Sequence, residues 1–108
     1  MNAYDDLMKV MQEGEEVESI VFGAWGWNGF QLPRNINHPP EGVAMSIDDA
    51  MPHMEGWSFN GGFGAPDCYA VYIWTNRRVL WVTEYDGSTC LDSAPRNPCD
   101  VIPDMPGG

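Results

Sequence analysis

Two runs of β-branched and aromatic residues, 68–75 and 78–85, lie only two residues apart in the second half of this chain. Such residues favour strands, and a two-residue connection, Asn76-Arg77, is short enough for a hairpin, so the runs predict an antiparallel pair. Asp86-Gly87 is a favoured type I′ hairpin dipeptide and predicts a third strand over 88–93. The sequence therefore predicts a C-terminal three-strand antiparallel meander.

The first half of the chain adds one strand signal and one clear helix signal. Residues 17–22 are apolar and β-branched enough to predict a strand, which would enlarge the sheet to about four strands. Residues 2–13 predict a helix, because Asn2 is a favoured N-cap, apolar side chains recur at helical spacing, and Gly14 follows.

A second, shorter helix is predicted over 47–55. Ser46 is a favoured N-cap residue, while Pro52 removes a backbone donor inside the helix and is expected to distort it. With both helices packed on one face of the antiparallel sheet, the predicted fold class is α+β.

Length and composition predict a single compact domain. The 108 residues, of which 44% are hydrophobic, are enough to bury a core. Residues 95–108 carry four prolines and end in two glycines, a composition that favours an extended chain. We therefore expect one α+β domain over 1–94 and an extended, proline-rich tail over 95–108.

The charge of the chain restricts its partners. Sixteen Asp and Glu residues stand against five Lys and Arg, a formal net charge of -11. This exceeds the magnitude of about 2–8 that serves solubility in a small domain. Such a protein repels nucleic acid and anionic membranes and attracts basic surfaces. Solubility alone is the alternative explanation for the acidity.

Candidate contacts with a basic partner are the carboxylates that cluster along the chain. They are Glu13, Glu15, Glu16, Glu18, Asp48, Asp49 and Glu55. Trp25 and Trp27, which alternate with glycines, are candidate aromatic anchors, since such residues dominate interface hot spots. Most aromatic residues are expected in the core, and stacking of a tryptophan on a small nucleotide-like ligand is a third option.

No metal, cofactor or catalytic site is expected. Cys68, Cys90 and Cys99 lack the Cys-x-x-Cys spacing of structural zinc sites, and Cys68 and Cys90 are expected to pack as small apolar residues. No nucleophile motif such as Gly-x-Ser-x-Gly occurs, so we expect a protein that is not an enzyme. Arg77, Arg78 and Arg96 are expected to form surface ion pairs.

Two features favour a cytoplasmic protein. An odd number of cysteines without framework spacing is typical of reduced thiols. The first sixteen residues are acidic and amphipathic, unlike the basic start and apolar stretch of a secretory signal.

In size, acidity, reduced cysteines and α+β outline, the chain resembles the small acidic phage proteins that disarm bacterial defence, such as anti-CRISPR and DNA-mimic anti-restriction proteins. Its stretches 84–89, 95–98 and 105–108 (Glu-Tyr-Asp-Gly-Ser-Thr, Pro-Arg-Asn-Pro and Met-Pro-Gly-Gly) also look like the ending of uncharacterised phage proteins. These inhibitor groups share no motif, so the resemblance implies a class of function and a location in the host bacterial cytoplasm, but no particular residues.

The expected function is therefore a non-enzymatic inhibitor that binds a basic nucleic-acid-binding surface of a host defence protein, without binding nucleic acid or membrane itself. Two alternatives stay open. One is a module that binds or sequesters a small nucleotide-like ligand in a tryptophan-lined pocket, and the other is a structural or assembly protein of a virus particle.

Overall fold

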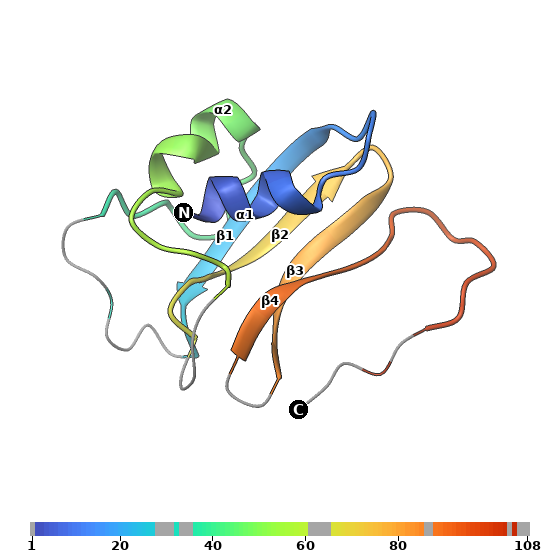
Figure 1. Ribbon diagram of the computed structural model, residues 1–108. Coiled ribbons are helices and arrows are strands. Elements are labelled where there is room, and N and C mark those ends of the chain that lie inside the picture. The colour runs from blue at the N-terminus through green and yellow to red at the C-terminus, as the bar shows by residue number, and fades with distance from the viewer. Residues whose placement is uncertain are drawn as a thin grey trace.

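Four antiparallel strands form a single sheet in the order β1-β2-β3-β4 (Figure 1). The strands are β1 (Val17–Trp25), β2 (Tyr69–Thr75), β3 (Arg78–Tyr85) and β4 (Ser88–Pro95). The computed structural model describes residues 2–27, 32, 36–60, 66–85, 88–103 and 105. The predicted α+β class and the meander β2-β3-β4 are confirmed, while the expected turn at Asp86-Gly87 lies outside the described residues.

Helix α1 (Ala3–Val10) begins as predicted but ends three residues early. Asn2 and Asp5 form a reciprocal capping box at its start. At its end, the Glu15 carboxylate accepts the backbone N–H of Gln12 at 3.0 Å, and Gly14 adopts a φ of 75°. This side-chain bond stabilises a tight turn over 12–15 in place of the last predicted helical turn.

The second predicted helix is split into two short pieces. Helix α2 (Ile47–Ala50) starts where the Ser46 hydroxyl accepts the N–H of Asp49, and it passes directly into a 3₁₀ turn, η1 (Met51–His53). Pro52 lies in that turn and has no N–H to continue α-helical bonding, so the expected distortion is confirmed.

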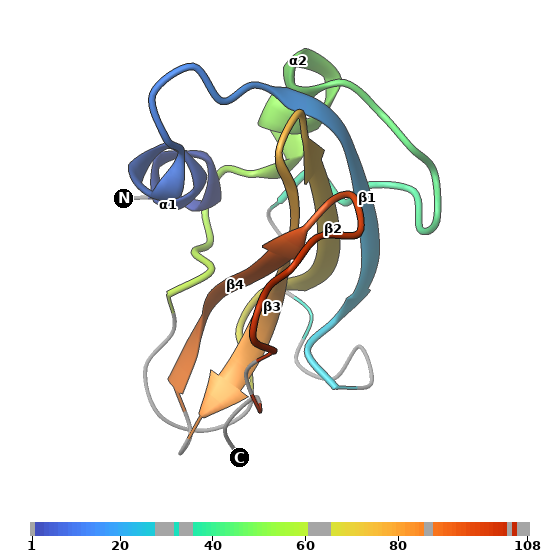
Figure 2. The same cartoon turned by 90° about the vertical axis from the view of Figure 1, so that its right-hand side faces the viewer.

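Side chains alternate between two faces of the sheet. In β2, Tyr69, Val71, Ile73 and Thr75 are buried, whereas the residues between them point away from the core. Ala3 and Leu7 of α1 and Ala50 of α2 are buried in the same core, so both helices cover this inner face (Figure 2). No described helix covers the opposite, outer face.

One edge of the sheet is covered by a neighbouring segment, and at the other edge one backbone donor is satisfied by a side chain. Residues 41–45 run beside β1, where Ile20 and Met45 exchange backbone hydrogen bonds of 2.8 and 2.9 Å. On β4, the Asp92 carboxylate accepts the N–H of its neighbour Ser93 at 2.7 Å, which satisfies a donor that an added strand would use. β4 runs to Pro95, so the first residue of the predicted tail belongs to the sheet.

Among the described residues, no helix is both long and apolar enough to cross a membrane.

Candidate functional site

Glu15, one of the predicted contacts, is a buried structural residue. Its carboxylate receives Arg78 Nε at 2.8 Å and Arg78 Nη2 at 2.9 Å, and the Thr75 hydroxyl donates to it at 2.6 Å. The side chain is fully buried, and the hydrogen bond from Arg78 lowers its pKa to about 2. Glu15 is therefore removed from the candidate contacts, because its charge is neutralised inside the protein.

Of the other predicted contacts in this stretch, Glu18 is also paired with an arginine. Glu18 is ion-paired with Arg96, and Arg77 donates a hydrogen bond to the Gln12 side chain. The predicted ion pairing is thus confirmed for Arg78 and Arg96, although the Arg78 pair is buried and not at the surface. Glu13 and Glu16 stay exposed.

A second group of carboxylates has no such neutralisation. Residues 41–55, here called the acidic segment, carry Glu41, Asp48, Asp49 and Glu55, all exposed. Within the described part of the chain, these four carboxylates have neither a hydrogen bond nor an ion pair. Residues 36–60 contain no Lys or Arg. Backbone bonds to β1 hold the segment in place, so its charges stand on a fixed support.

Trp25, the first predicted aromatic anchor, belongs to the core. Only 3% of its surface is exposed, and its ring packs edge-to-face on Tyr69 and Trp57, with centroids 5.0 and 5.9 Å apart. It therefore cannot contact a partner. Trp27 is 65% exposed and remains available as an anchor.

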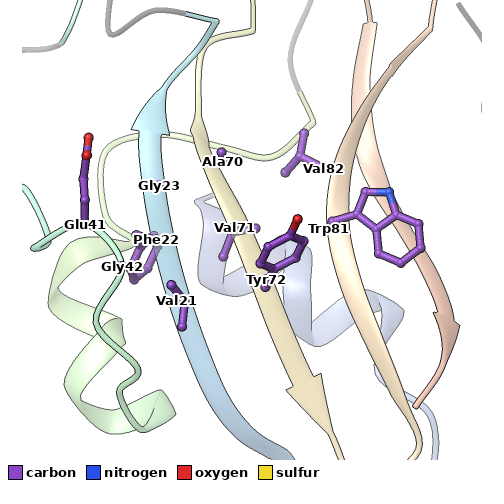
Figure 3. A pocket seen from close by; sticks show the side chains of 10 residues that line it. All are labelled: Val21, Phe22, Gly23, Glu41, Gly42, Ala70, Val71, Tyr72, Trp81 and Val82. Atoms are coloured by element: carbon purple, nitrogen blue, oxygen red, sulfur yellow. The ribbon is translucent and has the colours of Figure 1, made fainter. Parts of the chain in front are cut away.

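The outer face of the sheet contains a hollow that the sequence analysis missed. Its volume is about 590 Å³, and Figure 3 shows the residues around it. They are Val21, Phe22, Gly23, Glu41, Gly42, Ala70, Val71, Tyr72, Trp81 and Val82. The sequence did contain a signal for this hollow. In residues 69–75, the odd-numbered and the even-numbered positions are both largely apolar or aromatic. This pattern is typical of strands that present apolar side chains on both faces of a sheet.

The remaining reactive groups do not form a second site in the described chain. No three His, Cys, Asp or Glu side chains gather there as a metal site would require. Cys68 is buried as expected, and burial raises its pKa to about 12. Cys90 is exposed, contrary to expectation, because it lies on the outward side of β4 opposite Thr83. All three thiols are free.

No family model, curated protein or solved structure matches this chain. The charges, the outer face and the hollow are therefore the features of this protein that bear on its function.

Proposed function

We propose that this protein is a non-enzymatic inhibitor that binds the basic nucleic-acid-binding surface of another protein, and that its target belongs to a host defence complex. The supporting observation is the acidic segment. Its carboxylates are exposed, unpaired within the described chain, and carried by a segment that is hydrogen-bonded to β1. A protein surface that binds nucleic acid is lined with Lys and Arg, which attract such an array.

The charge of the whole protein supports the same partner. At a net charge of -11, long-range attraction speeds encounter with a cationic surface and slows encounter with nucleic acid. Asp48 and Asp49 are adjacent in α2, and their position on a folded support means that little conformational entropy is lost on binding. This contact is expected to weaken as salt rises, because exposed charges are screened.

The test is capture from a bacterial lysate with the tagged protein, followed by competition. We expect the captured protein to bind duplex DNA or RNA, and excess nucleic acid to displace it from the tagged protein. Raising the salt from about 50 to about 200 mM should release it as well. A captured protein that nucleic acid does not displace would overturn the proposal.

A matched pair of variants separates the acidic segment from net charge. Asp48→Asn/Asp49→Asn and Asp67→Asn/Asp100→Asn each remove two exposed carboxylates. The first pair is expected to weaken binding to the captured protein by about tenfold, about 1.4 kcal/mol, and the second by much less. Equal losses in the two variants would contradict a role for the acidic segment.

A further inference from the structure

The outer face of the sheet carries the neighbouring aromatic side chains Tyr72, Trp74 and Trp81, which no described helix covers. Its middle carries Val21, Tyr72, Trp74, Val79 and Trp81, which neighbour one another across β1, β2 and β3. Tyr72 is 57% exposed, and its ring lies 5.8 Å from that of Trp74. The other four side chains are half-buried. Contiguous apolar side chains that reach solvent mark binding surfaces.

The hollow gives this face a defined shape. Gly23 and Ala70 lie opposite each other on β1 and β2, so closely that a Cβ at Gly23 would come within 3.3 Å of the Ala70 Cβ. These small residues form the floor, Tyr72 and Trp81 stand on β2 and β3, and Glu41 lies at the far side of β1 (Figure 3).

The hollow is wide enough for a peptide. Glu41 bridges to β1 at Phe22, and Trp81 is on β3, so the two are separated by about three strand spacings, or about 14 Å. An extended chain covers that distance with about four residues. The residues at 101–103 of the tail lie beside Trp81 and border a further hollow of about 230 Å³ with Asp92 and Ala94.

The charges at the margins favour a cationic occupant. Glu41 lies at one side of the face, and Asp92, the cross-strand neighbour of Trp81, lies at the other. No Lys or Arg is among the described residues that line either hollow. A second copy of this chain is disfavoured, because it would bring another net charge of -11 against the first.

We propose that the outer face binds an extended, arginine-bearing segment of the partner protein. An arginine side chain stacks on the exposed ring of Tyr72 and the half-buried ring of Trp81, and its guanidinium is attracted to the carboxylates at the margins of the face. Aliphatic side chains of the same segment lie on the floor formed by Gly23 and Ala70. The inference rests on the proposed function for the basic nature of the partner and adds a second contact surface to the acidic segment.

The experiment uses a synthetic hexapeptide of alternating arginine and leucine, and a control peptide in which neutral citrulline replaces arginine. Calorimetric titration measures affinity, and amide chemical shifts locate the site. We expect shift changes at Val21, Gly23 and Ala70, and no measurable binding of the citrulline peptide.

Two variants test the face, and a third is the control. Tyr72→Thr keeps a good strand former at an exposed position and should weaken peptide binding by about tenfold. Ala70→Arg places a cation in the hollow and should abolish binding. Met8→Ala removes an exposed apolar side chain from α1, on the opposite side of the sheet, and should leave the affinity unchanged.

The other possible occupants are outcomes that overturn the inference. Equal binding of the citrulline peptide would make the face a general apolar surface. A dimer in sedimentation that Tyr72→Thr dissociates would assign it to a second copy. Binding of benzyltrimethylammonium without binding of the peptide would assign it to small ligands. If a captured partner depends on Asp48 and Asp49 but not on Tyr72, the inference fails while the proposed function stands. If the peptide binds but no nucleic-acid-binding partner is captured, the inference stands and the proposed function fails.

Discussion

Arg78 Nε lies 2.8 Å from Glu15 Oε2, although 63 residues separate the two in the sequence. The pair joins the turn after α1 to the start of β3, and Arg78 also donates to the Val10 carbonyl at the end of α1. The N-terminal helix is thereby attached to the hairpin by a buried ion pair, whose loss leaves an uncompensated buried charge.

This pair predicts a specific loss of stability in acid. The pKa of Glu15 is about 2 in the folded protein against 4.5 for the free side chain. Its stabilisation is therefore complete above pH 4.5 and is lost as the pH falls from about 4.5 towards 2. Glu15→Gln is expected to lower the free energy of unfolding at neutral pH by up to about 3 kcal/mol. It should also flatten the acid limb, which is the fall of this free energy as the pH drops below about 4.5. Urea titrations across this pH range measure both effects.

The neighbouring carboxylate serves as the control for that measurement. Glu16 is exposed, and only its backbone N–H is bonded, to the Asn76 side chain. Glu16→Gln should retain the pH profile of the unmodified protein. Parallel acid limbs in Glu15→Gln and the unmodified protein would contradict the assignment to Glu15.

Two glycines with positive φ are expected to differ in their tolerance of alanine. At Gly26, with φ at 59°, an added Cβ would lie 2.9 Å from the Pro66 carbonyl oxygen, whereas at Gly42, with φ at 72°, it would meet nothing within 4 Å. Gly42→Ala should cost about 1 kcal/mol from backbone strain alone. Gly26→Ala adds the clash and should cost about 3 kcal/mol. Thermal unfolding compares the two, and equal losses would refute the predicted close approach at Gly26.

The three cysteines should react with thiol reagents at two very different rates. Cys90 and Cys99 are exposed, while Cys68 is buried and has a pKa of about 12, so it holds almost no reactive thiolate at neutral pH. Mass spectrometry after brief treatment with iodoacetamide should find two modified thiols in the native protein and three after denaturation. Early modification of Cys68 would show that the structure opens near Trp25 and Tyr69.

Asp6 is expected to contribute to stability through the segment it holds. Its buried carboxylate accepts the Phe59 N–H at 3.0 Å and the Ser58 hydroxyl, which fastens residues 58–59 to α1. Asp6→Ala leaves the buried Phe59 N–H unpaired, at a cost of about 2 kcal/mol. Glu13→Ala, at an exposed position, should change the melting temperature little. Equal melting temperatures for the two variants would remove this role from Asp6.

Local patterns in the sequence predicted most of the elements. The strands β2 and β3 were predicted to within one residue, because β-branched runs and a two-residue connection need only neighbouring residues to define them. Strand β1 runs three residues beyond the predicted end at residue 22, with a register shift between Phe22 and Trp25. The predicted length of α1 was wrong, because the helix ends where the Glu15 carboxylate accepts the Gln12 N–H, and Arg78 holds that carboxylate in place.

The candidate site was predicted less well. The sequence showed the acidity and predicted Trp27 as an anchor, but it did not distinguish the buried Glu15 from its exposed neighbour Glu16. Their difference arises from contacts with distant residues. The outer face was missed for a related reason, since apolar residues on both sides of β2 do not reveal which side a helix will cover.

By itself, the sequence determined the net charge, the strand and turn signals of the meander and the capping of α1, since each depends on composition or on residues a few positions apart. Only the tertiary structure decided which carboxylates are neutralised and which rings are buried. Pairing β1 with β2 joins residues that are between 44 (Trp25 and Tyr69) and 58 (Val17 and Thr75) positions apart. Those contacts place Trp25 in the core while leaving Tyr72 and the carboxylates of residues 41–55 exposed.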